Sequence, residues 1–513
     1  MANLSLLWGA PQVNPVNHKA RSIPFLNPFS SVYGRVFFFS WFGFMIAFWS
    51  WYAFPPLLAD VIAGDIGMKQ YEVANSNIIA LTATLIVRLI AGPCCDHFGP
   101  RLTFAGCLLA GAIPTFLAGA VVNTSGLYAL RFFIGILGGS FVPCQVWTTG
   151  FFDKNVVGTA NALTGGLGNL GGGITYFVMP AVYNSLVKDG LSTSKAWRVS
   201  FVVPGILIVG VALCLLFLCP DTPTGPWNER IAAAEENLRH HSVTGVVTIP
   251  GEISEEQKPT SPSPPTTSPP SITADLAEKP HGYHDNEAQA TDHEMLTTAR
   301  GEVIQKPTFK DTLQVMFSPQ TLVTACCYFC TFGAELAINS ILGNYYMKNF
   351  PTLGLQETGN WAAMFGLLNG ITRPLGGYCS DLAYRRTQSV WMKKAVLHTY
   401  SILTGVFLIV IGILNPRHEA TMFGLVAGLA FFLEGANGAN FGLVPHVNPH
   451  ANGVVSGFTG AAGNLGGIVF AIIFRYMGRD YGKVFWIIGV VTIGVNGAVG
   501  WIRPVAKGQV GGR

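Results

Sequence analysis

Long apolar runs recur along this chain and constrain its fold more than any other feature. One of them, FFFSWFGFMIAFWSWYAFPPLL, starts at Phe37. An α-helix of about 20 residues crosses about 30 Å of hydrocarbon, and lipid offers no partner to free backbone N–H and C=O groups. Half of the 513 residues are hydrophobic and only 11% are charged, which is too little charge to cover a soluble surface. The sequence therefore predicts an all-α membrane protein.

The apolar runs fall into two groups of six. Breaks at glycine, proline and charged residues separate twelve predicted membrane spans, and a polar stretch separates the sixth span from the seventh. The spans lie near 36–58, 75–95, 102–122, 125–149, 159–184, 198–219, 320–345, 359–381, 393–414, 419–443, 452–476 and 481–502.

The stretch between the two groups predicts a disordered linker. Residues 220–310 are polar, acidic and rich in proline, so they lack the apolar side chains that would form a core. Ser261, Ser263 and Ser268 each precede proline and are candidate sites for a kinase, although a simple tether is equally compatible with this composition. We expect five parts: a cytoplasmic segment over 1–35, a six-helix bundle over 36–219, a cytoplasmic linker over 220–310, a second bundle over 311–502 and a cytoplasmic tail over 503–513.

Charge gives the expected orientation and excludes other classes of function. Arg385, Arg386, Lys393 and Lys394 follow the eighth span and favour the cytoplasm, so an even number of spans places both termini there. The net charge is only +4 and its cations are scattered, so we expect no nucleic-acid partner. Nearly all ten cysteines fall in apolar runs, where they are expected to pack rather than to bind metal or form disulfides.

The two halves of the chain repeat one another. RLIAGPCCDHFGPR in the second span aligns with RPLGGYCSDLAYRR in the eighth, and TGGLGNLGG at 164–172 aligns with TGAAGNLGG at 459–467. The separation is constant within each alignment and slightly larger in the second, a difference that loops can absorb. Two homologous six-helix bundles explain this pattern. The first alignment pairs Arg88 with Arg373, Gly92 with Gly377, Asp96 with Asp381 and Arg101 with Arg386.

These motifs resemble those of the major facilitator superfamily. GPCCDHFGPR is similar to its GxxxDxxGxR signature, and GYCSDLAYRR is similar to the degenerate second copy, with Tyr384 in place of a glycine. GLGNLGG and AAGNLGG, together with Arg88 and Arg373, resemble the nitrate signatures of the nitrate/nitrite porter family, and the long central loop resembles that of its fungal high-affinity nitrate transporters. The resemblance implies the major facilitator fold: twelve transmembrane helices in two pseudo-symmetric bundles, with alternating access to one central site.

Two arginines at equivalent depth form the centre of the predicted site. Arg88 and Arg373 each lie within an apolar span, where a cation is costly and turns toward a cavity or a partner. Facing one another, they would repel unless an anion lay between them. The planar, forked guanidinium suits a small planar oxyanion such as nitrate or nitrite. The alternative is that each arginine pairs with an acid inside its own bundle.

The glycine phrases supply the next candidates. Their small-xxx-small spacing predicts close helix packing, and the asparagine in each phrase carries a buried amide that needs partners. The resemblance places these asparagines beside the substrate. The residues are Asn169 and Asn464, with helix-packing glycines Gly168, Gly172, Gly463 and Gly467.

An aromatic wall follows from the resemblance alone. The family pattern places a phenylalanine in the first span, one in the fourth, and a tyrosine and a phenylalanine one turn apart in the seventh. In this sequence those positions are Phe48, Phe141, Tyr328 and Phe332. Stacked rings would exclude water and restrict substrate size.

The remaining charged candidates concern coupling and gating. Glu335 and Glu434 are intramembrane carboxylates that would either load a proton or neutralise an arginine. Arg131 resembles the fourth-span arginine of the superfamily, with a role in coupling or in packing. The aligned pairs Asp96 with Arg101 and Asp381 with Arg386 are expected to form cytoplasmic charge networks that break and re-form as the transporter changes state.

The resulting hypothesis is a plasma-membrane nitrate importer, with nitrite as a further substrate. Moving an anion into a negative interior opposes the potential by about 2.3 kcal/mol per charge per 100 mV, so a co-transported proton is expected. The chain lacks the GxxxxGK[ST] phrase of an ATP-driven pump and is not expected to be an enzyme or to carry a cofactor. Nitrate/nitrite antiport and a nitrate sensor that signals through the linker are the alternatives. By analogy with the superfamily, we expect a monomer surrounded by membrane lipid.

Overall fold

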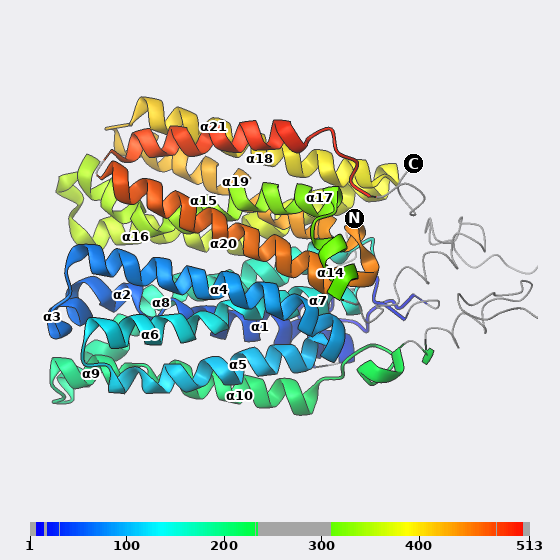
Figure 1. Ribbon diagram of the computed structural model, residues 1–513, viewed down its shortest axis with the longest axis horizontal. Helices are drawn as coiled ribbons and strands as arrows, with labels where there is room; N and C mark the ends of the chain where they lie inside the picture. Colours follow the sequence, from blue (N-terminus) through cyan, green and yellow to red (C-terminus); the bar gives the residue numbers. More distant parts are fainter. Residues whose placement is uncertain are drawn as a thin grey trace, which may run out of the picture.

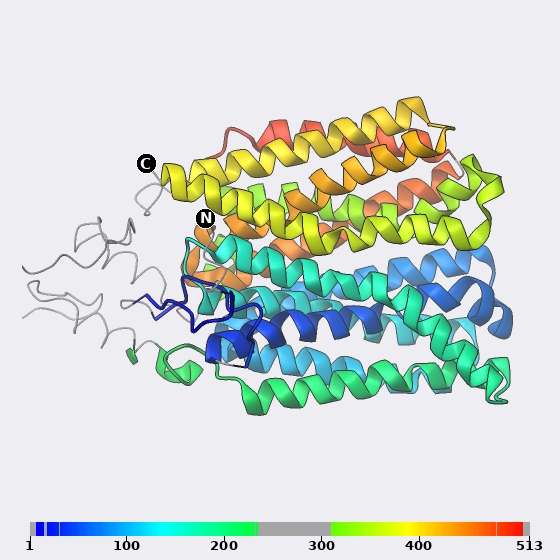
Figure 2. The ribbon, with the colours of Figure 1, turned by 180° about the vertical axis from the view of Figure 1, so that it is seen from behind.

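The computed structural model describes residues 7–14, 18–29, 31–230, 232–233, 309–478 and 480–505. Over these ranges the chain is helical, with long helices running roughly parallel to one axis (Figure 1). Helices from the first half of the chain gather on one side and those from the second half on the other (Figures 1 and 2). Most of the predicted linker, including Ser261, Ser263 and Ser268, lies outside the described residues.

The helices of the first half correspond to the first six predicted spans. α6 and α7 are joined by a 3-10 segment over Gly135–Ser140 and together form one span. The helices are α1 (Val32–Trp51), α2 (Pro55–Leu57), α3 (Ala63–Ile66), α4 (Gln70–Phe98), α5 (Pro100–Phe116), α6 (Thr124–Ile134), α7 (Phe141–Phe151), α8 (Val157–Lys188), α9 (Thr193–Ser200) and α10 (Val202–Leu218).

The helices of the second half correspond to the other six. The predicted span at 359–381 is divided between two helices that meet at Leu368. The helices are α14 (Phe309–Met316), α15 (Pro319–Asn349), α16 (Gly354–Leu367), α17 (Asn369–Thr387), α18 (Val390–Leu414), α19 (Glu419–Val447), α20 (Asn452–Met477) and α21 (Tyr481–Val499).

Among the described residues, ten helical stretches are long and apolar enough to cross a membrane. The other two predicted spans correspond to α8 and to α16 with α17. α8 contains the first glycine phrase, and α17 contains Arg373 and Asp381. Both pack between other helices, α8 against α1 and α17, and α17 against α8 and α19. Protein therefore covers part of the surface of these two helices, and the covered faces tolerate a less apolar sequence. The expected all-helical architecture is confirmed: the sequence predicts twelve spans, and the described residues hold about 10 to 12.

The two halves meet along two helix pairs, α4 with α20 and α8 with α17. A Cβ added at Gly92 would lie 2.5 Å from the carbonyl oxygen of Gly453, and one added at Gly377 would lie 2.5 Å from that of Gly158. Only glycine permits such an approach of two backbones. Because these are aligned positions in the two halves, the repeat in the sequence marks the contacts between the bundles.

Both chain termini lie at the same end of the molecule, here called the linker end; the opposite end is the far end (Figures 1 and 2). The N-terminal segment packs against the linker end. The N–H of Ala20 donates to the carbonyl of Phe151, and the N–H of Asp153 donates to the carbonyl of Ala20, each over 2.9 Å.

Candidate functional site

Arg88 lies on α4 with only 1% of its surface exposed. Its Nε donates to the carbonyl of Gly138 over 2.9 Å, and its Nη1 donates to the carbonyl of Gly460 over 3.1 Å. Gly138 belongs to the first half and Gly460 to the second, so this cation joins the two bundles. Both recorded bonds go to backbone carbonyls rather than to an acid.

Arg373 lies on α17 and is equally buried. Its Nη2 donates to the hydroxyl of Tyr328 over 2.9 Å. Its Nε and Nη1 are buried and find no hydrogen-bond partner in the part of the chain that the structure describes. Unpaired buried donors on a cation are costly, so these two groups are candidates for hydrogen bonds to an acceptor from outside the chain.

Three aromatic rings stack between the arginines. The planes of Phe141 and Tyr328 differ by 11°, and those of Tyr328 and Phe332 by 5°. The guanidinium carbon of Arg88 lies 4.9 Å from the ring centre of Phe141 and 5.3 Å from that of Phe332. For Arg373 the same distances are 5.6 Å and 5.9 Å. The two cations therefore share one pair of aromatic faces.

The remaining members of the predicted set surround this centre. Phe48 is separate from the stack and lies one turn beyond Phe44, which contacts Phe141. The amide of Asn464 donates to the carbonyl of Gly460 over 3.0 Å, the same carbonyl that holds Arg88. The phrase glycines lie against aromatic and aliphatic side chains. A side chain at Gly168 would meet Phe44, one at Gly172 would meet Phe48, one at Gly463 would meet Tyr328 and Phe332, and one at Gly467 would meet Leu336.

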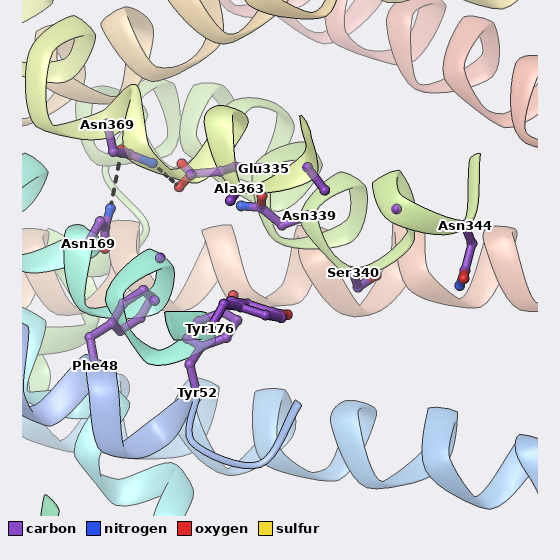
Figure 3. A pocket seen from close by; sticks show the side chains of 15 residues that line it. Phe48, Tyr52, Asn169, Tyr176, Glu335, Asn339, Ser340, Asn344, Ala363 and Asn369 are labelled. Carbon is purple, nitrogen blue, oxygen red and sulfur yellow. Dashed lines mark hydrogen bonds between the residues drawn. The ribbon is translucent and has the colours of Figure 1, made fainter. Parts of the chain in front are cut away.

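A cavity of about 200 Å³ lies in the far half of the molecule (Figure 3). It extends along α15 from Glu335, which is 4% exposed, to the exposed Asn344. Tyr52, Asn169 and Asn339 also line it. Tyr328 lies seven residues before Glu335 on the same helix, so the arginine centre is about 10 Å deeper than the cavity floor.

Glu335 is the acid at the floor of this cavity. Its two oxygens accept hydrogen bonds from the amides of Asn369 and Asn437, each over 2.7 Å. The Nδ2 of Asn169 donates to the Oδ1 of Asn369 over 3.5 Å, which links the first half to this carboxylate (Figure 3). The Oδ1 of Asn437 accepts from the hydroxyl of Thr331 over 2.6 Å.

The other two coupling candidates lie elsewhere. Glu434 is fully buried and does not line the cavity; its Oε2 accepts from Thr372 over 2.6 Å. Arg131 donates to Asn77 over 2.5 Å and lies over the ring of Phe54. The structure thus brings Glu335 to the site and leaves Arg131 in a packing contact within its own bundle.

The aligned aspartates cap helices of the opposite half. Asp96 accepts from the backbone N–H groups of Gly453 and Val454, at the start of α20, over 2.9 and 3.0 Å. Asp381 accepts from those of Gly158 and Thr159, at the start of α8, over 3.2 and 2.5 Å. A carboxylate at a helix N-terminus satisfies free donors and meets the positive end of the dipole. Both contacts lie near the linker end and hold the halves together there.

The aligned arginines do not join these aspartates in the way the sequence suggested. Arg101 bonds Asp221, just after α10, over 2.6 Å, and also donates to the carbonyl of Cys219. Arg386 is exposed near the end of α17. The cation that joins Asp381 is Lys393, over 2.7 Å.

Several residues of the site escaped sequence reasoning. Asn369 and Asn437 hold Glu335, and Lys393, which served only as a charge cue for orientation, forms a fully buried ion pair. A signal for Asn369 was available, because it precedes Arg373 by four residues and so shares its helix face. The described residues hold no group of three or more His, Cys, Asp or Glu side chains that could hold a metal ion.

Comparisons with known proteins agree with this architecture. The model of the Major Facilitator Superfamily matches residues 40–471. Elsinochrome transporter 1 of Elsinoe fawcettii is 43% identical over 99% of this chain and 100% of its own. High-affinity nitrate transporter 2.3 of Oryza sativa subsp. japonica is 29% identical over 91% of this chain and 77% of its own.

Solved structures support the fold at low sequence identity. The proton:xylose symporter XylE aligns with a TM-score of 0.58 at 13% identity, covering 90% of this chain and 94% of its own. The human organic anion transporter MFSD10 aligns with a TM-score of 0.54 at 11% identity, covering 91% of this chain and 99% of its own. With the family model, these matches show that the chain is a multi-pass secondary transporter, not an enzyme, and that it belongs to the Major Facilitator Superfamily.

Proposed function

We propose that this transporter imports nitrate, with nitrite as a further substrate, by proton symport across the plasma membrane. The observation that carries the proposal is Arg373: a fully buried guanidinium whose Nε and Nη1 have no partner among the described residues and whose neighbours are parallel aromatic rings. Each of these two N–H groups can donate a charge-assisted hydrogen bond to an oxyanion, although they lie on different edges of the guanidinium, with Nη2, which is bound to Tyr328, between them. The rings restrict the space beside it to a flat, small ligand.

Relatives named as nitrate transporters support this substrate at 28–29% identity over about nine-tenths of the chain. With both termini in the cytoplasm, the cavity at the far end faces outward and the two aspartate caps close the inner side. Rocking of the two bundles about the arginines would then alternate access. A proton supplies the driving force, because the membrane potential opposes anion entry.

A second candidate function is transport of elsinochrome or a similar compound. The relative named Elsinochrome transporter 1 supports it, since its identity of 43% over the whole chain exceeds that of the nitrate transporters. The buried position of Arg373 favours the smaller substrate, because this residue is 1% exposed and its guanidinium lies close to the rings of Phe141 and Phe332.

Uptake of ¹⁵N-nitrate into proteoliposomes, with and without an inward proton gradient, tests the proposal. We expect accumulation that depends on the gradient. Uptake driven only by internal nitrite would indicate antiport, binding without uptake would indicate a sensor, and transport of elsinochrome without nitrate would establish the second candidate. Each of these three results would overturn proton-coupled nitrate import.

A further inference from the structure

Glu335 lies at the floor of the outer cavity, on the side that faces the deeper anion site. It lies on α15, lines the cavity, and is held by amides from α17 and α19. Glu434 lacks this access because it is fully buried and does not line the cavity. Of the two intramembrane carboxylates proposed from the sequence, only Glu335 is positioned to exchange a proton with the far end.

The charged and titratable groups around Glu335 come from four other helices or their ends and from its own. Arg373 on α17 and Arg88 on α4 attract the carboxylate electrostatically from the side of the anion site. Glu434 on α19 and Tyr52 at the end of α1 face it, and Tyr328 lies two turns away on α15. Neutralising the carboxylate removes a negative charge opposite two arginines and so strengthens their attraction for an anion.

The hydrogen bonds of Glu335 favour the ionised form. Both of its oxygens accept from amide N–H groups, so a protonated carboxyl would direct its O–H at a donor. One amide must turn over to present its oxygen instead. The oxygen of Asn437 is held by Thr331 over 2.6 Å, whereas that of Asn369 is held by Asn169 over only 3.5 Å. Asn369 therefore turns at the lower cost.

A turn of Asn369 reaches the anion site through Asn169. In the structure, Nδ2 of Asn169 donates to Asn369, and Oδ1 of Asn169 has no partner among the described residues. After Asn369 turns, its N–H groups face Asn169 in place of its oxygen. Asn169 must then turn as well, so that its oxygen accepts and its N–H groups are released. It lies one turn beyond Gly165, where a Cβ would be 3.0 Å from Nε of Arg373.

We infer that Glu335 carries the transported proton and that the Asn369–Asn169 amide pair passes its protonation state to the anion site. The proton arrives from the outer cavity and binds one carboxylate oxygen; the two amides turn, and the released N–H groups of Asn169 join Arg373 in holding the anion. Anion and proton then bind with positive coupling, each raising the affinity for the other by the same factor. This inference rests on the proposed function, since it assumes the anion at Arg373.

Nitrate binding to the purified protein between pH 5 and 8 tests the inference, with isothermal titration calorimetry as the readout. With one proton per anion, the apparent Kd of the wild type rises up to tenfold per pH unit once Glu335 ionises. E335Q, which is permanently neutral, should bind tightly with a Kd independent of pH, and E434Q should keep the wild-type slope. Both substitutions preserve side-chain size.

Transport by the same variants supplies the second readout. In proteoliposomes E335Q should retain nitrate counterflow, which shows that it is folded and binds its substrate, and should lose accumulation driven by a proton gradient. A wild-type pH slope in E335Q, or a loss of the slope in E434Q alone, overturns the assignment of Glu335. Absence of nitrate binding and uptake in the wild type overturns the proposed function and the inference with it.

Discussion

Two contacts hold the bundles together at the linker end. In each, an aspartate caps a helix of the other half, but only the second is known to include an ion pair. Asp96 caps α20 with two backbone hydrogen bonds, and Asp381 caps α8 with two backbone bonds, a hydroxyl bond from Thr159 and the ion pair with Lys393. Both members of that ion pair are 0% exposed. The two equivalent contacts therefore contribute unequally to stability. The contact between α17 and α8 depends more on its aspartate than the contact between α4 and α20 does.

Neutralising each aspartate in turn tests this difference most severely. D381N leaves the ammonium of Lys393 buried without its counter-ion, and losing one member of a buried pair costs about 3–5 kcal/mol. D96N keeps a side chain that can cap the helix and removes only its charge, which is worth about 0.3–2 kcal/mol at a helix N-terminus. We expect the free energy of unfolding, measured by denaturant titration in detergent, to fall by about these amounts.

A double variant provides the control. In the alignment that pairs Asp96 with Asp381, the first half has Leu108 at the position of Lys393. D381N/K393L therefore removes the stranded charge and should recover most of the lost stability. Equal losses in D96N and D381N would show that the buried ion pair adds nothing to the cap.

The two arginines at the centre of the molecule also occupy equivalent positions but differ in their hydrogen bonds. Both recorded hydrogen bonds of Arg88 go to carbonyls, whereas Arg373 has two donors without a partner among the described residues. R373K should lower nitrate affinity at least about 100-fold, because two charge-assisted bonds are worth about 1.5–3 kcal/mol each. R88K should lower it about tenfold.

The free energy of unfolding should rank the two variants in the opposite order, with R88K the more strongly affected. R88K loses a contact that joins the bundles, so its free energy of unfolding should fall by about 1–3 kcal/mol, while that of R373K should change by less than about 1 kcal/mol. Calorimetry and denaturant titration on the same samples measure both effects. Equal losses of affinity would show that Arg88 also binds the anion directly.

The loops after the two aspartates differ in backbone conformation. Gly99 ends α4 with a φ of 92°, and a Cβ there would lie 2.9 Å from the ring of Trp227. The second half has Tyr384 at this position, α17 continues to Thr387, and Gln388 takes the left-handed conformation with a φ of 56°. G99A should destabilise the protein by about 1–2 kcal/mol and Q388G should stabilise it by about 0.5–1 kcal/mol, as measured by denaturant titration. A destabilised Q388G would show that contacts of the glutamine side chain outweigh backbone strain.

Sequence reasoning could pair residues where the two halves share them, and it offered no candidate where the halves differ. The constant separation within the first alignment identified Arg88 with Arg373 and Asp96 with Asp381, because a repeat places equivalent residues at equivalent depth. Asn369 and Lys393 were missed because Thr84 and Leu108 stand at their aligned positions in the first half. The partners of Arg88 are backbone carbonyls, which exist at every position and give no signal in a sequence.

At the far end, an ion pair joins two residues of the first half, Asp65 and Arg198, and does not connect the two bundles. Burial raises the pKa of Asp65, but hydrogen bonds from Trp197, Arg198 and Ser194 outweigh this and hold the pKa below its usual value of 3.8. A carboxylate with a lowered folded pKa stabilises the protein above its unfolded pKa, and this stability is lost as the pH falls through the folded pKa. Asp65 is partly exposed, so D65N should cost less than about 1 kcal/mol at pH 7, and this cost should shrink as the pH falls through the folded pKa. Thermal unfolding of the wild type and D65N at pH 7 and pH 3 measures the difference in stability, which should be the smallest effect of the series. An equal difference at both pH values would mean that the charge of the carboxylate contributes nothing to stability and that only the packing of the side chain matters.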